Sequence, residues 1–271
     1  MMRALWTAAS GMNTQQTHVD TIANNLSNIN TAGYKTEKAE FKTLLYQNLQ
    51  SQSTNTNGEK KPVSAQVGLG ARMASITSNF GQGSLNETGQ FMDWAIEGSG
   101  FYKVQTTGGE IKYTRNASFS LSVTDQGSMV TTSEGFPVLD VNNNTMIIPN
   151  DYTSSSLSIT NDGKLYAKNA QNELVGLGIQ VGLVQFANPA ALEKTGNSLF
   201  GVTDNSGQPM EETQTATLKR SVVHQNYIEA SNVNAADEMV NLIVAQRAYE
   251  MNSKAITTTD EMMQTANNLK R

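Results

Sequence analysis

The sequence predicts an α+β fold: a discontinuous, coiled-coil-like helical domain formed by both termini, with an irregular all-β domain inserted between its halves. Two observations lead to this prediction. The two ends, about 200 residues apart, both carry apolar residues at seven-residue spacing, which is typical of helices that pack against partner helices. The middle consists of short β-branched and aromatic runs separated by glycine and asparagine, which is typical of many short strands.

The N-terminal segment, residues 3–29, is predicted to form one amphipathic helix. The apolar positions along its seam are Leu5, Ala8, Met12, Val19, Ile22, Leu26 and Ile29. We expect the helix to end within residues 28–33, because asparagine and glycine adopt the left-handed backbone conformation that closes helices. Residues 34–49 are expected to form a short helix or an extended arm, and the polar segment 50–62 an exposed linker.

The middle of the chain, from residue 66 to about residue 227, is predicted to form many short strands. Its clearest turn signal is Asp162-Gly163, which separates the apolar runs 157–159 and 164–166. Because an Asp-Gly pair readily forms the tight turn between antiparallel strands, we expect a hairpin there.

The C-terminal segment, residues 234–269, is predicted to form a long helix that begins after cap residues 231–234, with Asp237 and Glu238 in its first turn. It carries two adjacent heptad rows, Leu242, Tyr249, Ile256, Met263 and Ala248, Ala255, Met262, Leu269. Together these rows form a stripe that one neighbouring helix could not cover. We therefore expect several neighbours, most simply other copies of the same chain.

Both seams together define the predicted assembly interface. Its residues are Leu5, Met12, Val19, Ile22, Leu26, Ile29, Leu242, Ala248, Tyr249, Ala255, Ile256, Met262, Met263 and Leu269. Polar Asn252 and Thr259 stand where residues that set helix register are found, and small Ala245 permits close approach. The predicted domains are residues 1–33 with 232–271 for helical assembly, 34–70 for an extended arm or linker, and 71–231 for the β-rich outer domain.

Composition restricts the possible functions. The 271 residues include no cysteine, so disulfides and thiolate zinc sites are excluded. A net charge of −5 without a long basic run argues against nucleic acid as a partner. The sequence has no apolar run of the length that membrane insertion requires, and its first residues do not form the apolar core of a cleaved signal peptide.

Catalytic, cofactor-binding and metal sites are not predicted. His18 is expected on the solvated face of its helix, and His224 is expected to be structural. The glycines of residues 98–100 begin like a dinucleotide fingerprint, but Lys103 replaces the third glycine. Residues 140–144 resemble the start of a calcium loop that lacks the required glycine.

Two long segments resemble the signature motifs of the flagellar basal-body rod and hook family. They are residues 24–35 and residues 229–254, and shorter matching runs between them extend the resemblance over nearly the whole chain. The motif residues are Asn24, Asn25, Asn28, Asn30, Gly33, Tyr34, Ser231, Asn232, Val233, Asn234, Gln246, Arg247, Tyr249 and Glu250. The total length and the polar insertion near residues 50–65 are most similar to members from the distal rod.

This resemblance implies a structural subunit that self-assembles into a helical tube, which transmits torque from motor to hook and encloses the export channel. The implied partners are further copies of the chain, proximal rod and hook subunits, outer ring proteins and the flagellar export apparatus. The implied location is the basal body across the periplasm, reached without a cleaved signal peptide. The alternative is an adhesin or tail-fibre module trimerised by its helices, with a glycan hydrolase as a more distant possibility.

Overall fold

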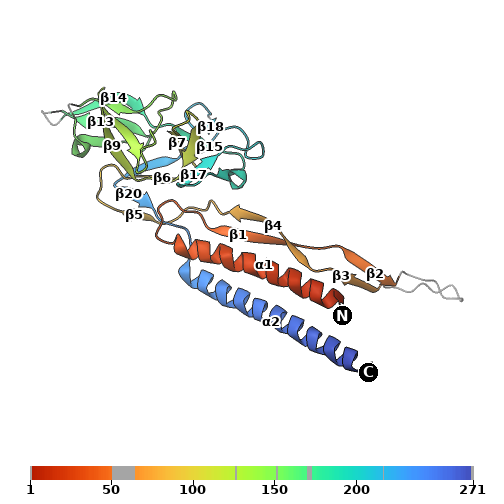
Figure 1. Cartoon of the computed structure of the whole chain (residues 1–271). Coiled ribbons are helices and arrows are strands. Elements are labelled where there is room, and N and C mark those ends of the chain that lie inside the picture. Colours follow the sequence, from red (N-terminus) through yellow and green to blue (C-terminus); the bar gives the residue numbers. More distant parts are fainter. Residues whose placement is uncertain are drawn as a thin grey trace. The chain divides into compact units, whose positions relative to one another are not determined.

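The computed structural model describes residues 2–50, 65–125, 127–150, 152–169, 173–215 and 217–269. Helix α1 (Met2–Ser27) begins the chain, helix α2 (Ala235–Asn268) ends it, and the strands lie between them, which confirms the α+β class (Figure 1). Except for Gln50, the predicted linker 50–62 lies outside the described residues.

The chain forms two compact units. The helical unit comprises the described parts of Met1–Ser27, Glu37–Thr77 and Asn234–Arg271. The β unit comprises the described parts of Asn28–Thr36 and Ser78–Val233.

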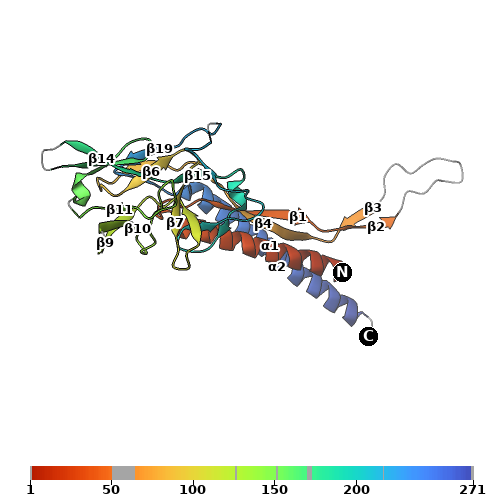
Figure 2. The ribbon, with the colours of Figure 1, turned by 90° about the horizontal axis from the view of Figure 1, so that it is seen from above.

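In the helical unit, α1 contacts α2 and also β1 (Glu37–Thr43), which pairs with β4 (Ala71–Ser78). Helix α1 lies between α2 and the β1–β4 pair, and β1 and β4 run along the helix (Figures 1 and 2). Strands β2 (Tyr46–Gln50) and β3 (Ala65–Gly68) form a separate antiparallel ribbon. Of the two predicted alternatives for residues 34–49, a short helix or an extended arm, the strands β1 and β2 agree with the extended arm.

The helix ends follow from local chemistry. The Asn234 side chain accepts a hydrogen bond from the backbone amide of Ala236 at 3.1 Å, which caps α2, and two acids occupy the first turn. Helix α1 ends at Ser27, so Ile29 follows the helix rather than extending its seam. Gly33 then takes a left-handed backbone with φ +69°.

The described residues of the β unit form four sheets. In spatial order the first consists of β19 (Val222–Gln225), β6 (Trp94–Glu97), β20 (Tyr227–Glu229) and β5 (Leu85–Glu87). The second consists of β16 (Glu193–Lys194), β17 (Leu199–Gly201), β8 (Ile111–Thr114), β7 (Phe101–Gln105), β15 (Leu183–Gln185) and β18 (Met210–Glu211).

The other two sheets are three-stranded. One consists of β11 (Ile147–Ile148), β10 (Gly127–Thr132) and β9 (Phe119–Thr124), and the other of β12 (Leu157–Ile159), β13 (Lys164–Lys168) and β14 (Leu174–Gln180). Short 3-10 turns cover Ser154–Ser156 and Pro189–Ala191. The predicted hairpin is confirmed, because β12 and β13 pair antiparallel across Asp162-Gly163 and Gly163 has φ +75°.

Strand β7 separates two apolar cores of the β unit, because successive side chains of a strand point to opposite faces. Phe101 packs with Tyr113, Phe186 and Phe200, whereas Tyr102 belongs to the larger core. That core also contains Trp94, Val104, Val130, Met146, Ile148, Leu165 and Val181. The β unit thus buries its large side chains within itself.

Candidate functional site

The seam between α1 and α2 contains small and polar side chains as well as larger apolar ones. On α2, Ala245 and Thr259 are buried, and Asn252 lies against Gly11 of α1. A Cβ atom on Gly11 would lie only 2.9 Å from the Asn252 amide nitrogen. The two helices therefore approach closely at this point, where a glycine faces the asparagine.

The predicted interface residues divide into two sets. Ile22 is buried, and the half-buried members are Leu5, Met12, Val19, Leu26, Ile29, Leu242, Ala248, Ile256 and Met263. The exposed members are Tyr249, Ala255, Met262 and Leu269. The first set is largely covered by the chain itself, so only the second set and its surroundings form a free surface.

An apolar stripe runs along the exposed side of α2, and we call it the α2 stripe. Its large members are Val240, Val244, Met251, Met262 and Leu269, which are between 52 and 82 % exposed. Their spacings of four, seven and eleven residues place them on one face of a helix with 3.6 residues per turn. The sequence analysis missed Val240, Val244 and Met251 because it followed strict heptads, although their four-residue and seven-residue spacings were visible.

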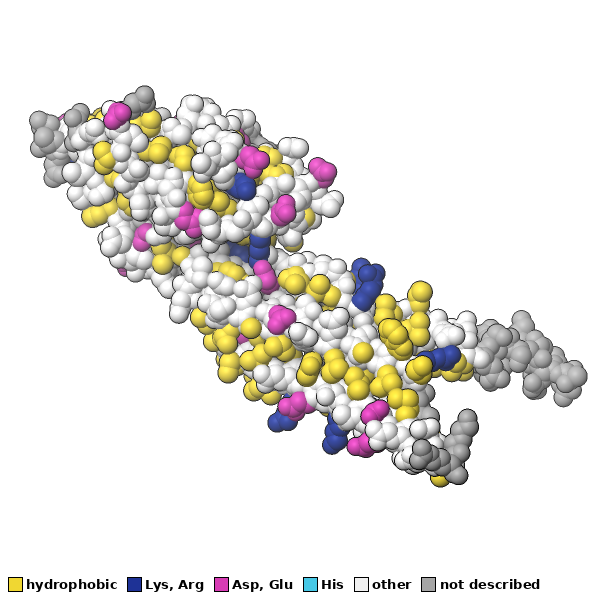
Figure 3. Space-filling view, viewed as in Figure 1, with side chains coloured by type: hydrophobic (Ala, Val, Ile, Leu, Met, Phe, Trp, Pro, Cys, Tyr) yellow, Lys and Arg dark blue, Asp and Glu magenta, His cyan; other side chains and the backbone are white. Residues whose placement is uncertain are grey.

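The strands of the helical unit expose apolar side chains as well. In the β2–β3 ribbon and its approach, Leu45 is 80 % exposed, Tyr46 60 % and Leu49 54 %. Met73 and Ile76 of β4 are also exposed. Hydrophobic side chains are seen along this unit in Figure 3. Contiguous exposed apolar surface of this kind marks interaction sites in soluble proteins.

A shallow groove of about 370 Å³ lies between the two helices. Gln16 and Val19 of α1 and Gln246, Tyr249 and Glu250 of α2 line it. Three of these five residues belong to the second family motif, so part of that motif faces an open surface rather than the interior of the chain.

Asn25 of the first motif joins three segments of the helical unit. Its side chain accepts a hydrogen bond from the Glu37 amide and donates one to the Glu37 carbonyl, both at 2.8 Å. It also donates to Glu238 of α2 at 3.3 Å. Burial raises the pKa of Glu238 while the Asn25 hydrogen bond opposes the shift. This amide thus fixes the ends of α1, β1 and α2 to one another.

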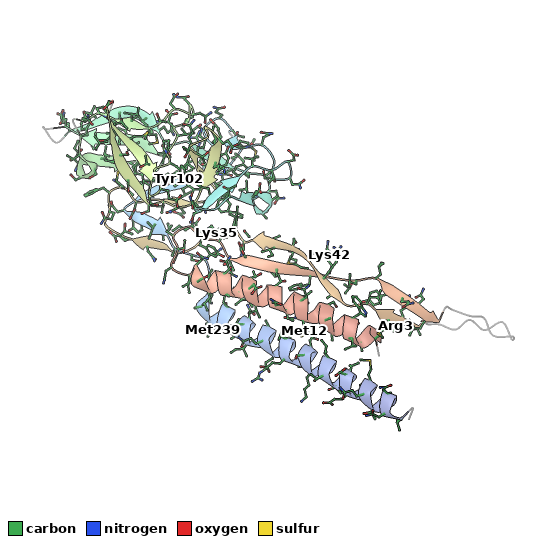
Figure 4. All side chains as sticks on the ribbon, viewed as in Figure 1. Arg3, Met12, Lys35, Lys42, Tyr102 and Met239 are labelled. Carbon is green, nitrogen blue, oxygen red and sulfur yellow. The ribbon has the colours of Figure 1, made fainter. Side chains whose placement is uncertain are left out.

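A buried ion cluster in the β unit involves residues next to the motifs. Lys35 Nζ lies 2.6 Å from Glu229 Oε1, and Arg115 Nε lies 3.3 Å from Glu229 Oε2. All three side chains are at most 2 % exposed. Burial lowers the pKa of Lys35, with Arg115 adding to the shift and Glu229 opposing it. The side chains of Lys35 and Tyr102 lie in this unit (Figure 4).

These charged residues were absent from the predicted site, although each stands inside a segment that resembles the family. The reason is that lysine, arginine and glutamate are almost never fully buried unless they are paired, and pairing over 194 residues is invisible in a sequence. Glu238 was likewise read only as a first-turn acid.

Asn232 of the second motif bonds to two other segments of the β unit. Its Oδ1 accepts from the Thr36 amide at 2.7 Å and from the Thr36 hydroxyl at 2.6 Å. Its Nδ2 donates to the carbonyls of Asn79 at 2.9 Å and Gly81 at 3.0 Å.

The remaining motif residues have simpler roles. Val233 is buried, Asn30 is exposed, and Asn24 donates to the Glu37 carboxylate. Asn28 accepts from Thr31, and Ser231 accepts from the Val233 amide. The Tyr34 ring lies beneath the Lys194 ammonium, 5.5 Å from its centroid, and Arg247 pairs with Glu250 on the surface of α2.

The histidines differ in part from expectation. His18 is half-buried with its ring edge on Phe41, 5.7 Å between centroids, so the predicted solvated position is wrong because β1 covers that side of α1. Burial lowers its pKa. His224 lies in β19 and contacts Glu97 at 2.7 Å. Among the described residues, acidic and histidine side chains form no cluster of three or more that could hold a metal ion.

Residues 140–144 form a turn in which Asn143 accepts from the Lys103 ammonium at 2.6 Å, an arrangement that places a cation where a calcium loop needs oxygen ligands. In the described part of the chain, neither helix has the length and apolar character needed to cross a bilayer.

Three family descriptions match successive parts of the chain. "Flagella basal body rod protein" matches residues 5–35, "Flagellar hook protein FlgE/F/G D1 domain" matches residues 95–167, and "Flagellar basal body rod FlgEFG protein C-terminal" matches residues 224–269. The matched ends contain the two helices and both motifs, and the matched middle lies in the β unit.

Three relatives that match the chain over nearly its whole length carry a common name. The flagellar basal-body rod protein FlgG of Borreliella burgdorferi is 44 % identical over 100 % of both chains. The FlgG of Agrobacterium fabrum is 41 % identical over 96 % of this chain and 97 % of its own, and the FlgG of Bacillus subtilis is 36 % identical over 100 % of both. These matches give no support to an adhesin or a tail fibre, and the family they define is structural rather than enzymatic.

Proposed function

Because this chain belongs to the FlgG family of flagellar basal-body rod proteins and is a structural subunit of the distal rod, we propose that it polymerises through its terminal helices into a helical tube. The tube encloses the export channel and carries torque from motor to hook. An interface that does not close on itself generates an open helix, which is the symmetry such a tube requires.

The α2 stripe is the observation that supports this assembly. Five large apolar side chains, each more than half exposed, lie on a face that α1 does not cover. Their burial against another copy would contribute about 1.5–3 kcal/mol each if it were complete, before ordering costs are subtracted. The exposed apolar residues of β2–β3 and β4 supply a second surface of the same chemistry for a neighbouring copy.

The pair formed by α1 and α2 is proposed to act as a coiled-coil-like assembly domain. On α2 buried or half-buried positions recur at intervals of three, four or seven residues, and we take them to face α1. They are Glu238, Leu242, Ala245, Asn252, Ile256, Thr259 and Met263. Small and polar residues within this seam permit close packing and set register, as in coiled coils with a buried asparagine.

The proposed domain roles follow the sequence-based division. Residues 1–33 and 232–271 form the assembly domain around the channel, and residues 34–70 form an arm. Of the predicted β-rich segment 71–231, residues 78–231 face outward toward the ring proteins, because residues 71–77 belong to the helical unit. Proximal rod subunits, hook subunits and the export apparatus are the further proposed partners. The subunit reaches the basal body through the export channel, and the rod spans the periplasm.

The test places one charge on the α2 stripe. Val244→Asp is expected to abolish assembly, because it would bury an unpaired carboxylate between subunits. Val244 is 61 % exposed within the chain, so the substitution should leave the monomer folded. The matched control is Thr257→Asp, an exposed position on the polar face of the same helix.

Both variants and the wild type are concentrated and imaged by electron microscopy, and each is tested for rods in cells that lack their own copy of the gene. Tubes or rods from wild type and Thr257→Asp but not from Val244→Asp support the proposal. Normal rods from Val244→Asp would show that the stripe is not an interface, and particles of fixed size from all three chains would return the closed trimer to consideration.

A further inference from the structure

The polypeptide passes between the two units four times, after residues 27, 36, 77 and 233. On the side of the β unit these connections belong to segments 28–36, 78–84 and 229–233. Hydrogen bonds within the β unit hold the three segments together, so the segments that carry the four connections form one bonded set. We call this set of bonded segments the collar.

The Asn232 side chain is the center of the collar. Its oxygen accepts two hydrogen bonds from Thr36, and its nitrogen donates both hydrogens, to the carbonyls of Asn79 and Gly81. Every donor and acceptor of the amide is therefore used. The backbone adds a bond from the Asn79 amide to the Thr36 carbonyl at 2.8 Å.

The buried ion cluster of Lys35, Arg115 and Glu229 adds further hydrogen bonds between the same segments. Lys35 Nζ donates to the Gly81 carbonyl at 2.9 Å as well as to Glu229. Glu229 also accepts from the Gly83 amide at 2.8 Å through its side chain and from the Gly33 amide at 2.8 Å through its backbone. Each of the three segments is thus bonded to both of the others.

We propose that Asn232 is a positioning residue for torque transmission: it holds the four connections as one bundle, so that force between the units is shared by all of them. This proposal rests on the function proposed above. A bundle bonded side to side resists twisting better than four separate single chains, because relative sliding of its members breaks several hydrogen bonds at once.

An amide is the chemistry that this position requires. Aspartate at position 232 would place a second carboxylate oxygen where Nδ2 now donates, facing the carbonyl oxygens of Asn79 and Gly81. Two donations would be lost and two oxygen–oxygen repulsions gained, while the size of the side chain stays the same. Asn232→Asp therefore loosens the collar without leaving a cavity.

The experiment compares wild type, Asn232→Asp and a control, Asn188→Asp, whose amide makes a single 3.4 Å bond to an exposed loop. Each is expressed in cells that lack their own copy, and rods are counted in isolated basal bodies. Rotation speed is then measured in media of increasing viscosity. Purified chains are examined by hydrogen exchange at the Thr36 and Asn79 amides.

We expect Asn232→Asp to assemble rods in normal number but to lose speed more steeply than the control as viscosity rises. Exchange at Thr36 and Asn79 should accelerate about fivefold or more, the factor that corresponds to one lost hydrogen bond of average strength. Unchanged exchange, or an unchanged dependence of speed on viscosity, would overturn the proposal.

A milder variant covers the case in which Asn232→Asp does not fold. Thr36→Val removes only the hydroxyl bond to Asn232 Oδ1, and Thr36→Ser restores it. A smaller change in the viscosity dependence for Thr36→Val, rescued by Thr36→Ser, supports the collar, and identical curves contradict it. Failure of the wild-type chain to form rods would instead refute the proposed function.

Discussion

The two units of this chain differ in how far they bury their own large apolar side chains. The β unit buries many of its aromatic and aliphatic residues in two cores and pairs its buried Lys35 and Arg115 with its own Glu229. The helical unit buries few large side chains and leaves an apolar stripe on α2 exposed. One unit thus covers most of its large apolar side chains within a single copy, whereas the other leaves an apolar surface uncovered.

The internal contacts of the units differ accordingly. Where α1 meets α2, the closest contacts involve Gly11, Ala245 and Asn252, which bury little apolar area. Where strands meet in the β unit, the Phe119 ring packs edge to face against Tyr102 and at a tilt against Trp94, and each ring brings a large apolar surface. We therefore expect the β unit to supply most of the stability of an isolated subunit.

The largest expected effect comes from removing the charge that completes the β unit. Glu229→Gln leaves Lys35 and Arg115 buried without a carboxylate, and breaking a buried pair in this way costs about 3–5 kcal/mol. Urea unfolding measures the loss as a lower midpoint. Trp94 is fully buried and Trp6 is 75 % exposed, so a Trp6→Phe background makes the fluorescence report on the β unit.

The control for this substitution is Glu110→Gln, which makes the same chemical change at an exposed turn. It should change the free energy of unfolding by less than about 0.5 kcal/mol. If both variants unfolded at the wild-type midpoint, the idea that the β unit depends on its internal charge pairing would be wrong.

The second largest effect is expected from alanine substitutions at two glycines of the β unit. Gly33 and Gly89 have nearly the same left-handed backbone, φ +69° and +68°. A Cβ at Gly33 would lie 2.7 Å from the Arg115 carbonyl oxygen, whereas nothing lies within 4 Å of a Cβ at Gly89. Gly89→Ala should therefore cost about 1–2 kcal/mol from backbone strain alone. Gly33→Ala should cost roughly 1–3 kcal/mol more from overpacking.

Paired urea titrations in the same fluorescent background measure this difference directly. Equal midpoints for the two alanine variants would mean that residues 28–36 are not packed against Arg115 in solution. In that case the collar would lack its foundation, and the first motif would act only through the helical unit.

Local features of the fold could be predicted from the sequence, and contacts between distant segments could not. Helix α2 and its Asn234 cap were predictable because capping and amphipathic periodicity are local properties of the chain. The Asp162-Gly163 hairpin was predictable for the same reason. The pairing of strands was not, because β6 bonds to β19 and β20, more than 100 residues away.

The candidate site also contains residues that the sequence predicts and residues that it does not. Exposed Met262 and Leu269 were identified from their spacing, whereas Val240, Val244 and Met251 needed a 3.6-residue period to be seen. The contact of Lys35 with Glu229 joins segments that are distant in sequence, so spacing carries no trace of it. Periodicity thus finds surfaces along one helix, and only the fold reveals clusters between segments.

The smallest expected effect concerns pH and the helical unit. Burial against Phe41 lowers the pKa of His18 below 6.5, so between the two values the unfolded chain binds more protons than the folded one. Stability therefore rises with pH in this window, and it should fall as the pH is lowered through 6.5. The thermal midpoint of the helical signal at 222 nm should fall on acidification by more in wild type than in His18→Gln.

Glu238 changes the stability of the helical unit with pH in the opposite direction to His18. Burial raises its pKa, so the folded chain takes up its proton first and acidification through that window stabilises the helical unit. The two groups thus act in opposite directions, and the wild-type curve alone cannot separate them. The difference between wild type and His18→Gln isolates the histidine, and Glu238→Gln should increase the acid sensitivity. A difference curve that is flat from pH 8 to 5 would show that β1 does not cover His18 in solution.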